Sequence, residues 1–385
     1  MTVYYFTPNR SLFGPGCIEE LGSLAQSFGL KKPMIVTDKV LVSLGMSERI
    51  QEILKKVQLD SVVFDAVEPN PTDKTVVKGV EYYQKQKCDG LISLGGGSPH
   101  DCAKAIGLVV SNGGEIKDFE GVDRSNNEMI PMIAINTTAG TAAEMTRFAI
   151  ITDTERHVKM AIIDWRTTPL AAINDPEFMV GMPQSLTAAT GMDALTHAVE
   201  AYVSTAANPL TDCAALKAMT VIGEYLPKAF ANGRDMEART QMAYAQYLAG
   251  MAFNNASLGY VHAMAHQLGG IYDLPHGVCN AILLPYVCEF NLVAQMERFC
   301  DIAVALGENI EGLSVREGAV KAIDAIESLC LQLEIPASLK ELGVKPEDFS
   351  IMADHAQKDA CCLTNPRIAT KEQIIAIYQK AYNGK

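Results

Sequence analysis

The stretch Gly90-Leu-Ile-Ser-Leu-Gly-Gly-Gly-Ser-Pro-His-Asp101 joins a short apolar run to three consecutive glycines and then to residues that commonly begin a helix. An apolar run of this length that is closed by glycines is typical of a buried strand ending in a tight turn. Ser98 and Asp101 have the spacing of an N-cap and the third helical residue, so we predict a helix start with amides available for a phosphate. A plain structural turn explains the glycines equally well.

The same alternation of short apolar runs and amphipathic segments continues through the first half of the chain. Apolar runs predict strands at 33–38, 61–65 and 132–136, and helical periodicity predicts helices at 46–57 and 73–87. Strands that alternate with helices form a mostly parallel sheet with helices on both faces. We therefore predict an α/β domain over residues 1–182.

A second turn, Thr137-Thr-Ala-Gly-Thr-Ala-Ala-Glu144, follows the strand predicted at 132–136 and again has cap spacing, from Thr141 to Glu144. Two such turns at the carboxyl ends of strands mark the crevice in which open α/β sheets bind nucleotides. The first turn departs from the dinucleotide fingerprint G-x-G-x-x-G, because His100 takes the third glycine position.

Asp38 ends the strand predicted at 33–38. Its carboxylate could accept hydrogen bonds from a ribose diol and would repel a 2′-phosphate, which favours NAD over NADP. An ordinary role as a turn residue at the end of a strand is an equally good interpretation.

Helical periodicity dominates the second half of the chain, from Leu186 onward, and Asn208-Pro209 and Asn232-Gly233 separate some of the segments. The predicted helices span 187–203, 210–226, 238–252, 258–269 and 292–306. The composition changes near Met182-Pro183, so we predict a second, all-helical domain over residues 183–385.

Four of the seven histidines fall between Gly191 and Gly277. Asp193 and His197 are four residues apart, which places them on one face of a helix. The motifs His262-Ala-Met-Ala-His266 and Pro275-His276-Gly277 follow. Imidazole and carboxylate without thiolate suit a divalent ion such as Fe(II), Zn(II), Mn(II) or Co(II).

A structural explanation of these residues competes with the metal site. A buried histidine is often a hydrogen-bonded core residue, and an aspartate in an early helical turn is often a cap. The spacing also leaves open whether His262 and His266 both bind an ion, or whether one binds while the other moves protons.

Length and composition limit the class of protein. With 385 residues the chain fits two domains, and a net charge of −13 disfavours nucleic-acid or anionic membrane partners. The N-terminus shows no signal peptide, and Met242–Gly270 is better explained by buried helices than by a membrane span. Ten cysteines without C-x-x-C spacing suit reduced thiols, so we expect a cytoplasmic protein.

These motifs together resemble the iron-dependent (group III) alcohol dehydrogenases, and the resemblance covers almost the whole chain. The matching segments are Phe13-Gly14, Thr37-Asp38, Glu68–Pro71, Gly95–Lys104, Thr137–Thr141, Ala189–Ala198, Gly250–Asn255, Gly259–His262, Met264–His266, Pro275–Gly277 and Asn365–Arg367. The resemblance implies a dehydroquinate synthase-like fold, with an α/β nucleotide-binding domain, an all-α domain and an active site in the cleft between them.

The resemblance also assigns residues. It implies that the metal is held by Asp193, His197, His262 and His276, and that His266 is a non-ligand near the nicotinamide and a candidate for proton relay. The cofactor contacts it implies are Asp38, Asn70, Gly96, Gly97, Ser98, Thr137, Thr138, Thr141 and Lys159. Fe(II) is the usual ion of the family, and the ligand types also accept Zn(II).

The expected activity is the NAD-linked interconversion of short primary alcohols or diols, such as 1,3-propanediol, with their aldehydes. Lactaldehyde reductase or methanol dehydrogenase specificity is the alternative, and Phe148 and Phe253 are candidate walls of the substrate pocket. A metal-dependent lyase of the dehydroquinate synthase type would need basic residues to bind a phosphorylated substrate. A non-catalytic nucleotide- or metal-binding protein is the competing class. The resemblance implies a homo-oligomer, either a dimer or a decamer.

Overall fold

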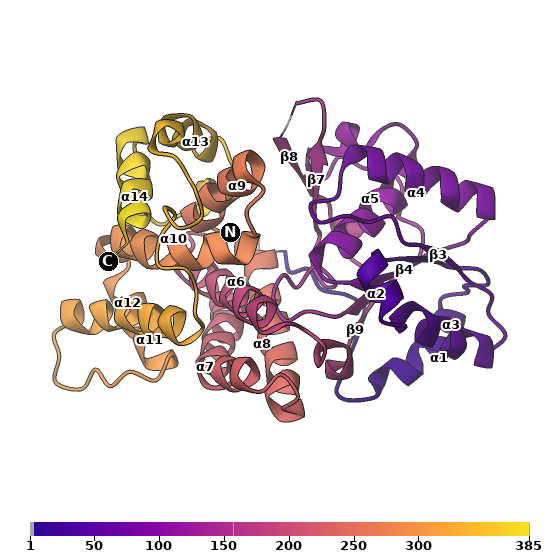
Figure 1. Ribbon diagram of the computed structural model, residues 1–385, viewed down its shortest axis with the longest axis horizontal. Coiled ribbons are helices and arrows are strands. Elements are labelled where there is room, and N and C mark those ends of the chain that lie inside the picture. Colours follow the sequence, from indigo (N-terminus) through magenta and orange to yellow (C-terminus); the bar gives the residue numbers. More distant parts are fainter. Residues whose placement is uncertain (1–3, 157, 385) are drawn as a thin grey trace. The chain divides into compact units, whose positions relative to one another are not determined.

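The computed structural model describes residues 4–156 and 158–384, and it divides into two compact units. Unit 1 runs to Thr138 and includes Ala142–Val180, whereas unit 2 consists of Ala139–Thr141 and the chain from Gly181 onward. Figure 1 colours unit 1 from indigo to magenta and the helices of unit 2 from magenta to yellow.

A six-stranded parallel sheet forms the centre of unit 1, in the order β1-β9-β6-β4-β2-β3. Because all neighbours pair in parallel, the carboxyl ends of these strands lie along one edge. The strands are β1 (Arg10–Phe13), β2 (Met34–Val36), β3 (Val62–Phe64), β4 (Leu91–Gly95), β6 (Met132–Asn136) and β9 (Ala171–Asn174). The chain order changes direction between β2 and β4, which is where open α/β sheets bind ligands.

Helices cover both faces of this sheet because its strands are apolar on both sides. In β2, Ile35 packs with the layer of α1 and α3, whereas Met34 and Val36 pack with the layer of α4 and α5. The helices of unit 1 are α1 (Leu21–Ser27), α2 (Lys39–Ser43), α3 (Met46–Lys56), α4 (Asp73–Gln86) and α5 (Gly97–Asn112). The predicted α/β fold is therefore confirmed.

A smaller sheet in unit 1 has the order β5-β8-β7 and was not predicted. Its strands are β5 (Gly121–Val122), β7 (Phe148–Asp153) and β8 (Val158–Ile163), and β7 and β8 form an antiparallel hairpin. The prediction also missed β1 and β9. These strands are short, and the sheet pairing that defines them joins residues about 160 positions apart in the sequence, such as Arg10 and Ala171.

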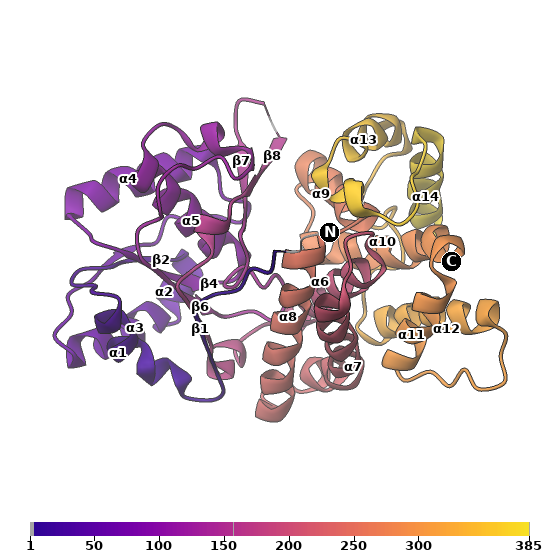
Figure 2. The ribbon, with the colours of Figure 1, turned by 180° about the vertical axis from the view of Figure 1, so that it is seen from behind.

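Unit 2 is built from helices, which confirms the all-α prediction for this half of the chain. They are α6 (Gln184–Val203), α7 (Pro209–Ala231), α8 (Met236–Ala256), α9 (Tyr260–Tyr272), α10 (His276–Asn291), α11 (Met296–Ala305), α12 (Val315–Gln332), α13 (Phe349–Ala356) and α14 (Lys371–Asn383). Figures 1 and 2 show α6, α7 and α8 side by side. Short 3-10 helices connect elements in both units: η1 (Cys17–Glu20), η2 (Ile116–Phe119), η3 (Trp165–Thr167), η4 (Pro176–Met179), η5 (Leu292–Ala294), η6 (Pro346–Asp348) and η7 (Ala360–Thr364).

The helix boundaries follow local capping chemistry. Asn208 accepts hydrogen bonds from the amides of Leu210 and Thr211, and Pro209 occupies the first position of α7, as its fixed φ allows. The helix predicted at 292–306 is shorter than expected: it begins at Met296, because Gln295 departs from helical dihedral angles.

Among the residues that the structure describes, one segment, His276–Ala294, is long and apolar enough to cross a membrane by length and composition. Of its most apolar window, 67% is buried. This segment is α10 with the adjoining η5, and α10 contacts α6, α9, α12 and α14. A helix that contacts four other helices in this way is a core helix of unit 2.

Candidate active site

Three helices of unit 2 each contribute a pair of polar residues one turn apart. On α6 the pair is Asp193 and His197, whose side chains are 3% and 6% exposed. On α9 it is His262 and His266, and on α10 it is His276 and Asn280. The i, i+4 spacing places each pair on one face of its helix.

Asp193 lies at the meeting point of these helices. Its Oδ1 atom is 3.9 Å from Nε2 of His197, 3.8 Å from Nε2 of His262 and 3.6 Å from Nε2 of His276. We call these four residues the four-ligand cluster. Ligand atoms about 2.0–2.2 Å from a tetrahedral ion are about 3.3–3.6 Å apart, so the cluster fits a divalent ion with little movement.

The structure distinguishes the two histidines of α9. His262 belongs to the four-ligand cluster, whereas Nδ1 of His266 lies 2.7 Å from Oδ2 of Asp359, which immediately precedes η7. The rings of His266 and His276 stack with centroids 5.4 Å apart. His266 is therefore a neighbour of the cluster, with a carboxylate partner of its own.

The backbone at the start of α10 determines where His276 lies. A Cβ atom on Gly277 would be 2.2 Å from the carbonyl oxygen of Ala189 on α6, which leaves no space for a side chain. Glycine thus allows α10 to approach α6 closely, and this approach brings His276 toward Asp193.

Asn280 was not predicted from the sequence to belong to the site. It is fully buried, and its Nδ2 donates to Oδ1 of Asp193 at 2.7 Å and lies 3.2 Å and 3.1 Å from Nε2 of His262 and of His276. The amide therefore contacts three members of the four-ligand cluster. Its position one turn after His276 was the available signal.

Charge is concentrated in this buried cluster. Burial alone would raise the pKa of Asp193, but the neighbouring imidazoles of His197, His262 and His276 hold it well below its usual range. Burial lowers the pKa of His197 to about 4. Burial also opposes the charge on His262, yet its hydrogen bonds with Asp193 and Glu200 raise its pKa to about 9. The carboxylates thus favour positive charge at this point, and a metal ion would replace the proton.

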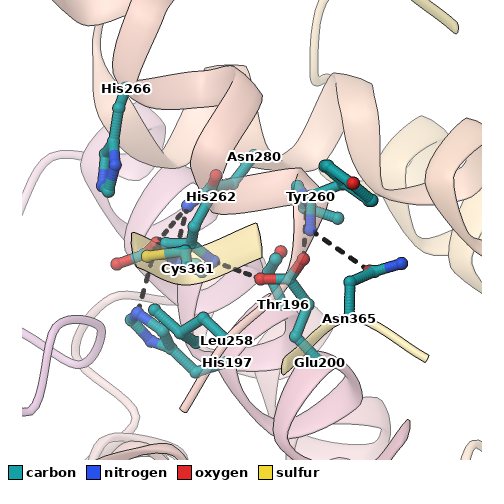
Figure 3. Close-up of polar contacts among 12 residues, drawn as sticks. Thr196, His197, Glu200, Leu258, Tyr260, His262, His266, Asn280, Cys361 and Asn365 are labelled. Atoms are coloured by element: carbon teal, nitrogen blue, oxygen red, sulfur yellow. Dashed lines mark hydrogen bonds and ion pairs between the residues drawn. The ribbon is translucent and has the colours of Figure 1, made fainter. Parts of the chain in front are cut away.

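Glu200 is a second residue that the sequence did not single out. Its Oε2 accepts from Nδ1 of His262 at 2.6 Å, and its Oε1 accepts from the amide of Val261 at 2.6 Å (Figure 3). A carboxylate on Nδ1 directs Nε2 toward the metal position and makes it a stronger ligand. Glu200 lies seven residues after Asp193, and this spacing on the same helix face could have revealed it.

The N-terminus of α9 is capped from elsewhere in unit 2, because Gly259 at its N-cap has no side chain. Asn365 accepts from the amide of Tyr260 at 3.3 Å, and Glu200 accepts from the next amide (Figure 3). A Cβ on Gly259 would be 2.7 Å from Oδ1 of Asn365 and 2.8 Å from Oε1 of Glu200. Gly259 and Asn365, both in matching motifs, therefore help to position His262.

Phe253 on α8 is 5% exposed, and its ring stacks on the ring of His197 with centroids 4.2 Å apart. The ring of His262 lies 4.6 Å from that of His197. Phe253 thus supports a ring of the four-ligand cluster as a buried aromatic residue of the core.

In unit 1, the expected nucleotide-binding turns lie at the carboxyl ends of adjacent strands. Gly96 and Gly97 follow β4, and Thr137 and Thr138 follow β6. A Cβ on Gly96 would be 2.9 Å from Cγ2 of Thr138, so the two turns are in direct contact. Two adjoining turns at this edge of a parallel sheet fit the diphosphate of a dinucleotide.

The predicted cap of α5 is wrong by two residues. The N-cap is Gly96, with no side-chain cap, and Ser98 lies inside the helix. Asp101 is directed elsewhere, because its Oδ2 accepts from the amide of Ile150 at 3.1 Å. No side chain therefore caps the first turn of this 16-residue helix, which suits a phosphate ligand.

The turn at Thr137–Glu144 does not begin a helix, although Thr141 and Glu144 have cap spacing. Thr141 belongs to the segment Ala139–Thr141 of unit 2, and a Cβ on Gly140 would be 2.7 Å from Cβ of Thr190 on α6. The segment Ala139–Thr141 therefore packs against α6 within unit 2.

Asp38 is the N-cap of α2, and its Oδ1 accepts from the amide of Leu41 at 2.9 Å. This bond is the turn role considered for Asp38, and its contact with the ribose stays a prediction. Asn70 and Lys159 lie together, with Nζ of Lys159 2.8 Å from Oδ1 of Asn70. Phe148, on β7, is partly buried, and its carbonyl accepts from Nζ of Lys104 at 2.7 Å.

Comparison with known families and proteins agrees with this arrangement. Residues 8–176 match the family described as iron-containing alcohol dehydrogenase. Residues 187–382 match the C-terminal domain of the Fe-containing alcohol dehydrogenase family.

Several curated proteins are similar over 98% of this chain. Alcohol dehydrogenase 4 of Schizosaccharomyces pombe is 52% identical, with 88% of its length covered. The NAD-dependent methanol dehydrogenase of Bacillus methanolicus is 50% identical, with 99% covered. The 1,3-propanediol dehydrogenase of Klebsiella pneumoniae is 49% identical, with 98% covered.

Solved structures are similar as well. A crystal structure of 1,3-propanediol oxidoreductase aligns with a TM-score of 0.98 and 49% identity, covering 99% of this chain and 100% of that one. Sulfoacetaldehyde reductase from Bifidobacterium kashiwanohense, in complex with NAD⁺, aligns with a TM-score of 0.90 and 29% identity, covering 98% of both chains. The chain therefore belongs to the iron-containing alcohol dehydrogenase family, and it is an alcohol oxidoreductase.

Proposed function

We propose that this protein is a metal-dependent, NAD(H)-linked dehydrogenase that interconverts short primary alcohols or diols, such as 1,3-propanediol, with their aldehydes. The observation that carries the proposal is the convergence of three imidazole Nε2 atoms within 3.6–3.9 Å of Oδ1 of Asp193. Similarity to the named 1,3-propanediol and methanol dehydrogenases supports the substrate class.

Asp193, His197, His262 and His276 are the proposed ligands of a divalent ion. One carboxylate among three neutral imidazoles leaves such a site with net positive charge. When bound, the ion supplies Lewis-acid polarisation of an alcohol or carbonyl oxygen, and the nicotinamide supplies the hydride chemistry. Fe(II) is the proposed ion because of the family, and Zn(II) is the alternative.

The protein's own residues position the ligands and move the proton. Glu200 holds Nδ1 of His262, so that Nε2 is presented to the ion. Asp359 accepts from Nδ1 of His266, which leaves Nε2 of that ring as its proton acceptor. His266 is therefore the proposed group that receives the proton of the alcohol, either directly or through a water molecule.

Residues 1–182 are the proposed NAD-binding domain, and residues 183–385 the proposed metal-binding domain. Gly96, Gly97 and Ser98 would meet the diphosphate at the N-terminus of α5, and Thr137, Thr138 and Thr141 would contact it from the neighbouring turn. Asn70 and Lys159 are the remaining proposed contacts. Asp38 would accept from the ribose and disfavour a 2′-phosphate.

Phe148 is the proposed wall of the substrate pocket. Lactaldehyde reductase or methanol dehydrogenase specificity is the alternative substrate preference. Cytoplasmic localisation and a dimeric or decameric homo-oligomer are proposed from the sequence and the resemblance. The proposed binding partner is a small alcohol or aldehyde. We propose no nucleic-acid or membrane partner.

A lyase of the dehydroquinate synthase type is the competing enzyme. It would need basic side chains to bind a phosphorylated, acidic substrate. The three helices that carry the four-ligand cluster, α6, α9 and α10, contain no Lys or Arg. The dehydrogenase is therefore favoured.

The test combines elemental analysis with an alcohol panel. Protein purified without oxygen should contain one divalent ion per chain and should accumulate NADH when propanol or 1,3-propanediol is added. His276→Ala should lose both properties, whereas the matched variant His355→Ala, at an exposed position of α13, should keep them. NAD binding without turnover of any alcohol would indicate a non-catalytic protein, and NAD that is consumed and regenerated would indicate a lyase.

A further inference from the structure

We propose that His266, Asp359 and Cys361, here called the His266 cluster, form a second cation site that takes a thiophilic divalent ion such as Zn²⁺ or Cd²⁺. The three residues offer one nitrogen, one oxygen and one sulfur atom, and these atoms lie within 4.8 Å of one another. The set shares no residue with the four-ligand cluster.

Hydrogen bonds already join the three residues. Nδ1 of His266 lies 2.7 Å from Oδ2 of Asp359, and the thiol of Cys361 hydrogen-bonds to the same carboxylate. The carboxylate of Asp359 is thus the shared hydrogen-bond partner of the nitrogen and the sulfur. Figure 3 labels His266 and Cys361 in one view with His197 and His262 of the four-ligand cluster.

Local structure holds the ligands in place. Asp359 is the N-cap of η7, and its Oδ1 accepts from the amide of Cys361 at 2.9 Å. This cap fixes the orientation of the carboxylate relative to Cys361. His266 comes from α9, and α9 contacts η7 directly. The site therefore needs side-chain adjustment only.

The adjustment of the nitrogen–oxygen pair is small. Ligand atoms bonded to one tetrahedral ion are about 3.3–3.6 Å apart when one is nitrogen and the other oxygen. Nδ1 of His266 and Oδ2 of Asp359, now 2.7 Å apart, must separate by about 0.6–0.9 Å. His266 and Asp359 have side chains that are 16% and 17% exposed, so an ion can reach them from solvent.

The donor set selects the type of ion. A thiolate with an imidazole and a carboxylate suits Zn²⁺ and its softer relative Cd²⁺, whereas Mg²⁺ and Ca²⁺ prefer oxygen alone. Three protein ligands leave a fourth tetrahedral position for water or a small anion. The four-ligand cluster contains no sulfur, so a thiolate–metal bond distinguishes the two sites.

Protons balance in a simple way. The Cys361 thiol loses its proton to solvent as the sulfur–metal bond forms. The proton on Nδ1 of His266 moves to Nε2 through solvent, which frees Nδ1 to bind the ion. Each bound ion therefore releases a single proton, and no atom is oxidised or reduced.

Occupancy has a consequence that rests on the proposed function. A ring whose Nδ1 binds an ion carries its proton on Nε2, so His266 can no longer accept a proton from the alcohol. The second site would thus inhibit turnover, with the four-ligand cluster and its metal intact.

The test is a titration of the full-length protein, with its own metal bound, with Cd²⁺ alone in the presence of a thiol-free reductant. The readout is the ultraviolet charge-transfer absorbance that only a thiolate–cadmium bond gives. Wild-type protein should show saturable absorbance, and inhibition of alcohol turnover should follow it. Cys361→Ser should remove the absorbance, and His266→Ala should weaken Cd²⁺ binding at least about tenfold. Cys362→Ser, at the adjacent cysteine, is the matched control and should behave as wild type.

Two results overturn the proposal: no thiolate absorbance in wild-type protein, or equal absorbance and affinity in Cys361→Ser. If Cys361→Ser does not fold, the Cd²⁺ affinity of His266→Ala is the deciding measurement. Unchanged Cd²⁺ affinity in that variant overturns the proposed site. Cys361-dependent Cd²⁺ binding by a protein that oxidises no alcohol would leave this site standing and refute the proposed function. An active dehydrogenase that does not bind Cd²⁺ through Cys361 would support the proposed function and refute this site.

Discussion

Glu200 accepts a 2.6 Å hydrogen bond from Nδ1 of His262 and, through its other oxygen, a 2.6 Å bond from the amide of Val261. One buried carboxylate therefore caps α9 and fixes the ring that α9 presents to Asp193. The secondary structure and the proposed metal site depend on the same side chain.

Glu200→Gln separates these two roles. A glutamine can still accept from the amide of Val261, but its NH₂ group cannot accept from Nδ1–H of His262, so the ring loses its orientation. We expect metal affinity to fall about ten- to hundredfold, with helical content close to that of wild type. Metal-buffered titration and circular dichroism measure the two effects.

The control for this change is Glu289→Gln, on the same unit at the exposed end of α10, where the carboxylate pairs with Lys380 at 3.0 Å. It should leave metal affinity unchanged. Equal affinity of Glu200→Gln and wild type would show that Nδ1 needs no carboxylate.

Gly277→Ala tests the close approach of α10 to α6. The new methyl group would be 2.2 Å from the carbonyl oxygen of Ala189, so the helices must move apart. We expect the free energy of unfolding of unit 2 to fall by about 1–3 kcal/mol, with loss of bound metal. Denaturant unfolding and metal analysis check both expectations.

Gly270→Ala on α9 is its control, because a Cβ there meets no atom within 4 Å. Alanine should stabilise the helix by about 0.5–1 kcal/mol and leave metal content unchanged. Similar behaviour of the two variants would mean that Gly277 has no special role.

Periodicity was sufficient for several segments that bury one face or are buried throughout. The central strands β2, β3, β4 and β6 and most long helices followed from it. The helices α12 and α14 were not predicted, although each begins with a capping box. Periodicity failed for β1 and β9, whose partners are distant in the sequence, and for α10, which contains Pro285 and is apolar around most of its circumference. Pairing partners and tertiary burial define these elements, and local sequence does not contain that information.

The candidate metal site was predicted less completely than the fold. Spacing alone placed Asp193 and His197 on one face, but it could not separate His262 from His266, since both lie on the same face of α9. The resemblance made that distinction, and the structure brings His262 to Asp193. The ligand roles themselves stay predictions. Glu200 and Asn280 were missed although their spacing from Asp193 and from His276 was an available signal. Asp359 was missed because a single acidic residue in a loop gives no pattern.

Asp38 supplies a prediction for cofactor preference. Asp38→Ser keeps a side chain that can cap α2 but removes the negative charge. If the carboxylate lies near the ribose, kcat/KM for NADP relative to NAD should rise at least about tenfold, because a charge repulsion of about 1.4 kcal/mol or more is lost. Steady-state kinetics with both cofactors provides the measurement.

Asp38→Ala serves as the comparison, since it also removes the cap and should lower the free energy of unfolding by about 1 kcal/mol. Equal cofactor ratios in wild-type and Asp38→Ser protein would assign Asp38 to the turn alone.

His100 makes the stability of unit 1 dependent on pH. The ring is fully buried with Nδ1 2.6 Å from Oγ of Ser93, and burial together with the nearby charge of Lys104 lowers its pKa from 6.5 to about 3. Because the folded state binds this proton more weakly than the unfolded state, the stabilisation is present above pH 6.5 and is lost progressively as the pH falls toward 3. Each pH unit in this window should cost about 1.4 kcal/mol.

His100→Gln removes the titrating group, so its stability should depend less on pH in this window. Between about pH 6.5 and pH 5, wild-type unit 1 should lose about 2 kcal/mol more than this variant. Denaturant unfolding followed by the fluorescence of Trp165, the single tryptophan and a residue of unit 1, gives the measurement. His355→Gln, at an exposed position of α13, should retain the wild-type slope. Parallel curves for His100→Gln and wild type would show that the buried ring does not control acid unfolding.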